Sequence, residues 1–320
     1  MIDGCGREID HLRLSLTDRC NLACRYCIPE GAEPSRRMIA PAFAFEIVRW
    51  LSQEHGIRHV RLTGGEPLLY PDLIPLIEQL SALDTLHQVT LTTNAQALSR
   101  RATALRAAGL SRINISLDTL RADRFAKLTR GGNITHTLAG VEAAVQAGLT
   151  PVKINVVAQR GLNHDELADI ARWGLSRGCV VRFLEVMPIG PLAHVVDRHL
   201  VPASEILERL GERFELRPIP GSLGQPATDY SAAAGSLRGV VGLIAPTTRP
   251  FCSRCRRLRV TSRGSLVACL LDDKNFDLSR CWDGRAIDFD RAEAMLRLAV
   301  EGKPAIGPRE QSLTMLTLGG

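Results

Sequence analysis

Runs typical of β-strands alternate with runs that have the period of amphipathic helices between residues 12 and 187. Several of the helical runs end in glycine, which favours a helix C-terminus. Strands that alternate with helices at this spacing predict repeated β-α units and a parallel sheet. The strands are expected at residues 12–17, 59–64, 88–93, 112–117, 152–157 and 180–186.

Six units are too few for a full eight-stranded barrel, so we expect an α/β fold with an open, partial (β/α)6 barrel of the TIM type. Functional residues of parallel β-α folds gather at the carboxyl ends of the strands. After residue 190 the alternation weakens, and a passage rich in glycine and proline, residues 217–239, is typical of a linker or a hairpin. We therefore expect a barrel domain, residues 1–225, and a C-terminal extension, residues 226–320, that carries a second metal-binding group.

Composition favours a small anionic ligand. The net charge of +6 is carried mainly by arginine, whose rigid fork suits phosphate and carboxylate, although genome composition alone could produce this bias. Aromatic residues are only 4% and the arginines are spread along the chain, which is not typical of a nucleic-acid surface. The chain has neither an apolar run long enough for a membrane helix nor a signal-peptide pattern, so we expect a cytoplasmic protein.

A first group of cysteines, Cys20, Cys24 and Cys27, follows the first expected strand with the spacing C-x-x-x-C-x-x-C. Such a loop can place three thiolates on one face of an iron–sulfur cubane and leave one iron without a protein ligand. Zinc is the alternative, but a structural zinc site takes four ligands and no fourth lies nearby in sequence. The motif TGGEPLL, residues 63–69, ends the second strand; its glycines allow close backbone approach to a ligand, and Glu66 can accept from an ammonium group.

A second group, Cys252, Cys255 and Cys269, lies in the basic stretch FCSRCRRLRVTSRGSLVACL. Spacing alone leaves open a structural zinc knuckle whose fourth ligand is Cys281 or a histidine. Disulfides are not expected in a reducing compartment. The cysteines that match no motif are expected to be free thiols: Cys5, Cys179 and Cys281.

Six basic residues lie on or beside expected strands: Arg13, Arg61, Lys153, Arg182, Arg257 and Arg259. Arg257 and Arg259 project to one side if their segment is a strand. Cations that converge on one cavity repel one another unless an anion is present, which makes a polyphosphate ligand plausible.

The first cysteine group and the GGEP motif together resemble the radical S-adenosylmethionine (SAM) superfamily. That resemblance implies a [4Fe–4S] cluster on these cysteines, SAM bound to its open iron, and one-electron cleavage of SAM to methionine and a 5′-deoxyadenosyl radical. The second group narrows the resemblance to the GTP 3′,8-cyclases of molybdenum cofactor biosynthesis. It extends over nearly the whole chain, through LRLSLTDRCNLACRYC, VRLTGGEPLL, LTTN, INISLD, VKINVV, RFLEVMPIG and the terminal GG.

In that family a second [4Fe–4S] cluster binds the purine through its open iron, and here its ligands would be the second cysteine group. The implied reaction removes the ribose 3′ hydrogen of GTP and closes the ring to (8S)-3′,8-cyclo-7,8-dihydroguanosine 5′-triphosphate. The family's SAM-binding residues correspond to Tyr26, Gly65, Ser116 and Met187. Its GTP-binding residues correspond to Arg13, Arg61, Thr92, Lys153, Arg257 and Arg259. Further candidates are Glu66, Arg182 and the tail residues Gly319 and Gly320, which would insert toward the active site.

The chain departs from the family at His59, Ala95 and Arg256, where lysine, glycine and asparagine are usual. His59 leaves one phosphate contact of the family open. The resemblance implies an electron donor such as flavodoxin or ferredoxin and a downstream cyclic pyranopterin monophosphate synthase, allows a homodimer, and gives no reason to expect a membrane or nucleic acid as a partner. Two alternatives remain: a radical SAM enzyme with an auxiliary cluster that modifies a peptide, and a non-enzymatic iron–sulfur or zinc scaffold that binds nucleic acid.

Overall fold

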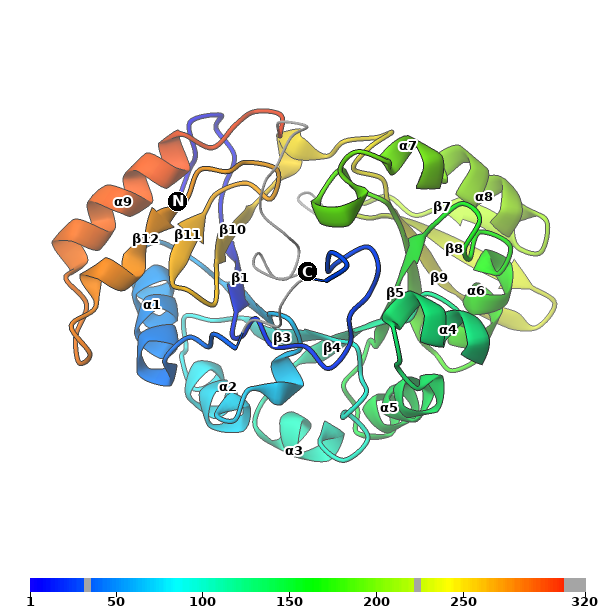
Figure 1. Cartoon of the computed structure of the whole chain (residues 1–320), viewed down its shortest axis with the longest axis horizontal. Coiled ribbons are helices and arrows are strands. Elements are labelled where there is room, and N and C mark those ends of the chain that lie inside the picture. The colour runs from blue at the N-terminus through cyan, green and yellow to red at the C-terminus, as the bar shows by residue number, and fades with distance from the viewer. Residues whose placement is uncertain (32–35, 222–225, 308–320) are drawn as a thin grey trace.

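The computed structural model describes residues 1–31, 36–221 and 226–307. The strands in these ranges join into one sheet of twelve, in the order β12-β11-β10-β1-β2-β3-β4-β5-β6-β9-β8-β7. The sheet curves into an open barrel, and the larger helices lie on its outer side (Figure 1).

Six neighbouring parallel strands form the barrel wall: β1 (His11–Ser15), β2 (His59–Thr63), β3 (Gln88–Thr93), β4 (Arg112–Ser116), β5 (Lys153–Ala158) and β6 (Val180–Glu185). Side chains alternate between the two faces of a strand. On β1, Leu12 and Leu14 belong to the hydrophobic core, so Arg13 between them faces the barrel interior. The partial (β/α)6 barrel expected from the sequence is confirmed.

The helices that connect these strands are α1 (Pro41–Gln53), α2 (Leu73–Ser81), α3 (Ala102–Ala107), α4 (Ala122–Thr129), α5 (Ile134–Gln146) and α6 (Leu167–Leu175). Each turns an apolar stripe toward the sheet. In α1 the stripe includes Phe43, Ile47 and Leu51, which are at most 3% exposed. The hydrophobic core therefore lies between the strands and the helices, which leaves the inner face of the barrel available for polar side chains.

The remaining elements are α7 (Val196–His199), α8 (Ala203–Gly211), β7 (Glu215–Pro218), β8 (Thr228–Ala234), β9 (Leu237–Ile244), β10 (Arg257–Val260), β11 (Ser265–Val267), β12 (Phe276–Asp277) and α9 (Phe289–Glu301). Short 3-10 turns occur at η1 (Pro67–Leu69), η2 (Gly190–Leu192), η3 (Cys252–Arg254) and η4 (Leu278–Cys281). No helix in the described ranges is both long and apolar enough to span a membrane.

The C-terminal part of the chain extends the barrel at both edges. β9 pairs in parallel with β6, and β10 pairs in parallel with β1. β8 and β9 form a hairpin that turns at Gly235, so the passage around them contains a hairpin rather than only a linker. Residues on both sides of position 225 thus share one sheet, and a domain boundary at that position stays a prediction.

Candidate active site

The first cysteine loop follows β1 and rests on the loop after β2. A Cβ atom on Gly65 would lie only 2.3 Å from the Arg19 carbonyl oxygen, and one on Gly64 only 2.4 Å from the Thr17 carbonyl oxygen. Only glycine allows backbones to approach this closely. The Gly65 N–H donates to the Thr17 carbonyl over 2.6 Å. The two glycines therefore position the backbone that leads into Cys20.

Glu66 ties the same loop to the end of β3. One carboxylate oxygen accepts from the Thr93 hydroxyl (2.6 Å) and the Leu68 N–H (3.0 Å), and the other accepts from the Asn94 N–H (2.7 Å). The side-chain amide of Asn94 in turn lies 3.8 Å from the Cys20 Sγ. Burial raises the pKa of Glu66 to about 6. The carboxylate thus positions Asn94 beside the cysteine loop, and a bond from Glu66 to a ligand ammonium stays a prediction.

Tyr26, between two cysteines of the first group, is anchored to the end of β4. Its hydroxyl donates to the Asp118 carboxylate over 2.9 Å, and Asp118 also accepts from the Val157 N–H over 2.8 Å. Ser116 is the last residue of β4, and Met187 follows the end of β6. The four predicted SAM-binding positions therefore lie at the carboxyl ends of the parallel strands. Asp118 was not among the candidates, although a carboxylate just after a strand was a usable signal.

Among the described residues, no positive charge contributes to the pKa shifts of the thiols in the first group. Burial raises the pKa of Cys20 to about 11 and that of Cys27 to about 12. Burial, with Asp118 and the two other cysteines, raises the pKa of Cys24 well above its usual value. Since thiolates are the form that binds metal, a cationic inorganic core would supply the missing charge. The site fits an iron–sulfur cluster on these three residues.

The second cysteine group lies at the opposite end of the barrel. Cys255 precedes β10, which runs parallel to β1, whereas Cys20 comes after β1. Cys269 follows β11, which is antiparallel to β10, so it returns to the same end as Cys255. Although burial acts in the other direction, Arg257 and Lys303 lower the pKa of Cys255 to about 6. This site is electropositive and also fits a cluster bound by three thiolates.

The spacing of the sulfur atoms disfavours mononuclear zinc in either group. Tetrahedral zinc, with Zn–S bonds of about 2.3 Å, holds its sulfurs about 3.8 Å apart. Among the described residues, only Asp10, His11 and His59 bring three ligand atoms within 4.8 Å of one another. Neither described cysteine group therefore has all three sulfurs within 4.8 Å of one another, and this wider spacing is compatible with a cubane. Cys281, considered as a fourth zinc ligand, is packed in the hydrophobic core.

Basic side chains occupy the barrel interior between the two cysteine groups. Arg13 is in register with Arg61 on β2 and with Arg259 on β10. The three arginines therefore lie at the same height along the barrel axis, which we call one level. Burial, followed by the charge of Arg257, lowers the pKa of Arg13 to about 9. Burial, followed by the charge of Arg13, lowers the pKa values of Arg61 and Arg259 well below their usual value. An anion at this level would relieve the repulsion between them.

The opposite wall adds further cations. Lys153 is 9% exposed and Arg182 is 6% exposed. Burial, followed by the charges of Arg182 and Arg112, lowers the pKa of Lys153 to about 7, while Asp229 partly opposes this shift. Thr92 lies on β3, half-buried, in register with Asn114 on β4. Arg112 and Asp229 were missed from the sequence, although Arg112 has the same inward parity as Ser116.

Comparisons with known proteins agree with this geometry. Residues 14–174 match the family model of the radical SAM superfamily, and residues 179–307 match that of molybdenum cofactor synthesis C. A GTP 3′,8-cyclase of Moorella thermoacetica is 42% identical over 95% of this chain and 94% of its own length. One of Streptomyces coelicolor is 44% identical over 95% of this chain and 90% of its own. The chain belongs to the GTP 3′,8-cyclase family.

Solved structures with low sequence identity support the fold alone. Streptococcus suis SuiB bound to S-adenosylmethionine has a TM-score of 0.62 at 15% identity, covering 87% of this chain and 65% of SuiB. Members of the GTP 3′,8-cyclase family are radical SAM enzymes, so the alternative of a non-enzymatic scaffold that binds nucleic acid is wrong.

The structure explains two places where this cyclase-family chain departs from the usual sequence. Ala95 adopts a left-handed backbone with φ of 61°, a conformation that favours glycine. Arg256 forms ion pairs with Asp10 and Glu8, which join the second cysteine loop to the N-terminal segment. Both residues therefore alter the scaffold of the site rather than its interior.

The third departure, His59, lies on the inner side of β2, one level below Arg61. Its ring centroid is 4.4 Å from that of His11. The His11 Nδ1 forms a hydrogen bond of 2.5 Å with the Asp10 carboxylate. Burial, followed by the charge of His11, lowers the pKa of His59 to about 4. His59 is therefore neutral at pH 7, in contrast to the lysine usual in the family.

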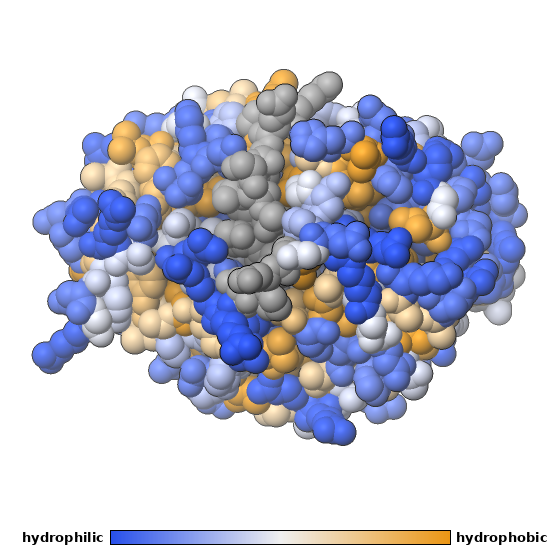
Figure 2. Space-filling model, in the orientation of Figure 1, coloured by the Kyte–Doolittle hydropathy of each residue, from blue (hydrophilic) through white to orange (hydrophobic). Residues whose placement is uncertain are grey.

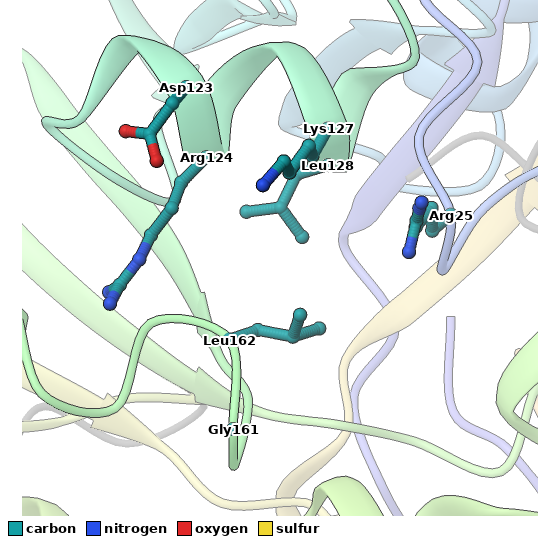
Figure 3. A pocket seen from close by; sticks show the side chains of 7 residues that line it. All are labelled: Arg25, Asp123, Arg124, Lys127, Leu128, Gly161 and Leu162. Carbon is teal, nitrogen blue, oxygen red and sulfur yellow. The ribbon is translucent and has the colours of Figure 1, made fainter.

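A separate pocket lies between the first cysteine loop, α4 and the residues that follow β5, and includes Arg25, Arg124 and Lys127 (Figure 3). Arg124 forms ion pairs with Asp165 and Glu166. The face of the molecule shown in Figure 2 is mostly hydrophilic, with smaller hydrophobic areas between the polar side chains. The pocket is lined by none of the predicted ligand-binding residues.

Proposed function

We propose that this chain converts GTP to (8S)-3′,8-cyclo-7,8-dihydroguanosine 5′-triphosphate, the first step of molybdenum cofactor biosynthesis. One observation carries the proposal: the two cysteine groups lie at opposite ends of β1 and β10, and the basic residues lie between them. A nucleotide that spans this interior can meet SAM at one end and the second cluster at the other. The family relatives that cover most of this chain bear the name of the same reaction.

The cofactors of the family are SAM and [4Fe–4S] clusters, which supply the radical chemistry when they are bound. Cys20, Cys24 and Cys27 would hold the first cluster, and Cys252, Cys255 and Cys269 would hold the second. Tyr26, Gly65, Ser116 and Met187 would bind SAM at the carboxyl ends of the strands. The tail residues Gly319 and Gly320 lie outside the described residues.

The barrel interior supplies binding and orientation. The triphosphate would contact the cations on β1, β2, β5 and β10, namely Arg13, Arg61, Lys153, Arg257 and Arg259, and Thr92 and Arg182 would complete the set. Charge-assisted hydrogen bonds from buried donors are stronger than those in water. The enclosing strands limit the access of water, which protects a reactive radical from side reactions.

The same proposal includes the partners that the reaction needs. An electron donor such as flavodoxin or ferredoxin would reduce the first cluster, and a cyclic pyranopterin monophosphate synthase would take the product. A homodimer and a cytoplasmic location also belong to the proposal. No membrane or nucleic-acid partner is included.

Anaerobic assay of the reconstituted protein with SAM, a reductant and GTP tests the function. We expect 5′-deoxyadenosine and cyclised guanosine triphosphate in equal amounts, detected by chromatography and mass spectrometry. Deoxyadenosine without a cyclised nucleotide would refute the proposal. In that case a peptide substrate would become the leading alternative.

A further inference from the structure

Lys303 is a buried lysine beside the second cysteine group. It is 3% exposed, and in the described part of the chain its ammonium forms no ion pair with a carboxylate. It donates instead to two backbone carbonyls, those of Arg257 (2.6 Å) and Ala268 (2.5 Å). Arg257 follows Cys255 by two residues, and Ala268 directly precedes Cys269. The ammonium therefore bridges the two strands that present these cysteines.

The segment after α9 forms one wall of the same site. A Cβ atom on Gly307 would lie 3.3 Å from the Cys269 Sγ, so this backbone passes directly against the sulfur. Figure 1 shows the segment running from α9 beside the N-terminal part of the chain. Lys303 is thus held close to the cysteines by its own backbone as well as by its side chain.

Arg7 fixes that segment in place. Its guanidinium donates to the Cys252 carbonyl (2.8 Å), the Pro304 carbonyl (2.9 Å) and the Lys303 carbonyl (3.3 Å). Asp3 orients Arg7 through an ion pair of 2.6 Å. Arg7 therefore joins Cys252, the first cysteine of the group, to the segment that carries Lys303, and its own charge is compensated by Asp3.

Besides bridging the strands that present the cysteines, Lys303 can balance the negative charge of a bound cluster. Three thiolates outweigh the doubly positive core of an oxidised [4Fe–4S] cluster, so the bound cluster carries net negative charge, and reduction adds one more. Burying such a charge is unfavourable unless a cation lies nearby. A buried cation stabilises the reduced state more than the oxidised state, and it therefore raises the reduction potential.

We infer that Lys303 is the buried counter-cation of the second cluster, which positions Cys255 and Cys269 and raises the reduction potential of that cluster. The inference rests on the proposed function, because it assumes that the second cysteine group holds a cluster. Lys303 acts through the cysteines and is a positioning residue. The ammonium has three donors, of which two are used by the carbonyls of Arg257 and Ala268.

The test compares Lys303→Gln, which removes the charge but keeps a hydrogen-bond donor, with Lys303→Arg, which keeps the charge. Lys274→Gln, an exposed lysine in the same part of the chain, is the matched control. Each variant is made in the full chain with both clusters, and again with Cys20, Cys24 and Cys27 replaced by alanine to isolate the second cluster. Iron and sulfide are measured, and the reduction potential is obtained by titration followed by electron paramagnetic resonance.

We expect Lys303→Gln to lower the potential with its iron retained, Lys303→Arg to restore it toward the wild-type value, and Lys274→Gln to change nothing. Loss of the second cluster in Lys303→Gln but not in Lys303→Arg would also support the inference. An unchanged potential in Lys303→Gln, or loss of the cluster in both Lys303 variants, would overturn it. Absence of cyclised nucleotide in the wild-type assay would instead refute the proposed reaction while leaving this comparison intact.

Discussion

At the scale of single residues, we expect Lys153 to make the proposed nucleotide binding depend on pH. Its pKa is lowered to about 7 by burial and by the charges of Arg182 and Arg112. A bound triphosphate would raise this pKa, so binding above pH 7 takes up a proton. We expect the affinity for GTP to fall as the pH rises from 7 to 9, measured by calorimetric titration of the reconstituted protein.

The variants Lys153→Met and Lys153→Arg separate this effect from others. Arginine keeps its charge across the whole range, so Lys153→Arg should flatten the pH dependence. Lys153→Met should flatten it too, and should weaken binding by about tenfold at pH 7, since a charge-assisted hydrogen bond is lost. A slope in Lys153→Met equal to that of the wild type would contradict this assignment.

At His59, by contrast, we expect a substitution to strengthen the binding of GTP. The imidazole is neutral at pH 7, because burial and the charge of His11 lower its pKa to about 4. His59→Lys would add a positive charge one level below Arg61, and we expect the dissociation constant for GTP at pH 7 to fall by about tenfold. His136→Lys is the control, because His136 is exposed on α5. Equal affinities in both variants would show that the triphosphate does not reach His59.

At the scale of elements, the loop after β2 is the support on which the first cysteine loop rests. A methyl group on Gly65 would overlap the Arg19 carbonyl oxygen at 2.3 Å, and neither backbone can move without displacing Cys20. We expect Gly65→Ala to destabilise this region by about 2 kcal/mol and to lose iron from the first cluster. Iron analysis and SAM cleavage measure the effect.

Gly211→Ala is the matched control, because a Cβ atom there meets nothing within 4 Å. It should retain iron and SAM cleavage. Full iron content in Gly65→Ala would mean that the loops can separate without loss of the site.

The sequence was sufficient to predict the barrel strands but not the short elements. Each barrel strand alternates or runs apolar between clear helices, so its position is visible locally. The α4 helix is harder to see in the sequence, since half of its residues, Ala122–Thr129, are polar and only Phe125, Leu128 and Thr129 are buried. The pairing of β9 with β6 and of β10 with β1 depends on contacts distant in sequence, which no local pattern reveals.

The same distinction holds for the candidate site. The cysteine groups and GGEP are short motifs that are visible in the sequence itself. Asp118, Arg112 and Lys303 act through neighbours from other elements, and only the folded chain brings those neighbours together. Parity along β4 would have found Arg112, whereas nothing local distinguishes Lys303 from a surface lysine.

Another contact between elements is the ion pair of Arg256 with Asp10 and Glu8, which joins the start of β10 to the segment before β1. Asp10 is buried, so without Arg256 the negative charge of its carboxylate would be only partly balanced inside the protein. We expect Arg256→Asn to lower the free energy of unfolding by about 1 kcal/mol, measured by denaturant titration. Arg217→Asn, whose ion pair with Glu215 is exposed, should change it within error. An equal loss in both variants would contradict this account.

At the scale of the whole molecule, the barrel separates two tasks along one axis. The carboxyl ends of the strands hold the first cysteine group and the predicted SAM-binding residues, and the other end holds the second group. The basic interior links them, so a ligand must extend along the barrel to use both. The two ends should therefore be separable by mutation, although they share strands β1 and β10.

Cys252→Ser tests this separation. Reconstituted wild-type protein should contain about eight iron atoms per chain, and the variant about four, because only the second cluster is lost. We expect SAM cleavage at the first cluster to persist in part, while GTP cyclisation falls below detection, since the purine loses its anchor. Cys5→Ser is the control, because Cys5 is exposed and belongs to neither group. Loss of SAM cleavage together with loss of folding in Cys252→Ser, seen by circular dichroism, would mean that the second group stabilises the whole barrel rather than binding substrate.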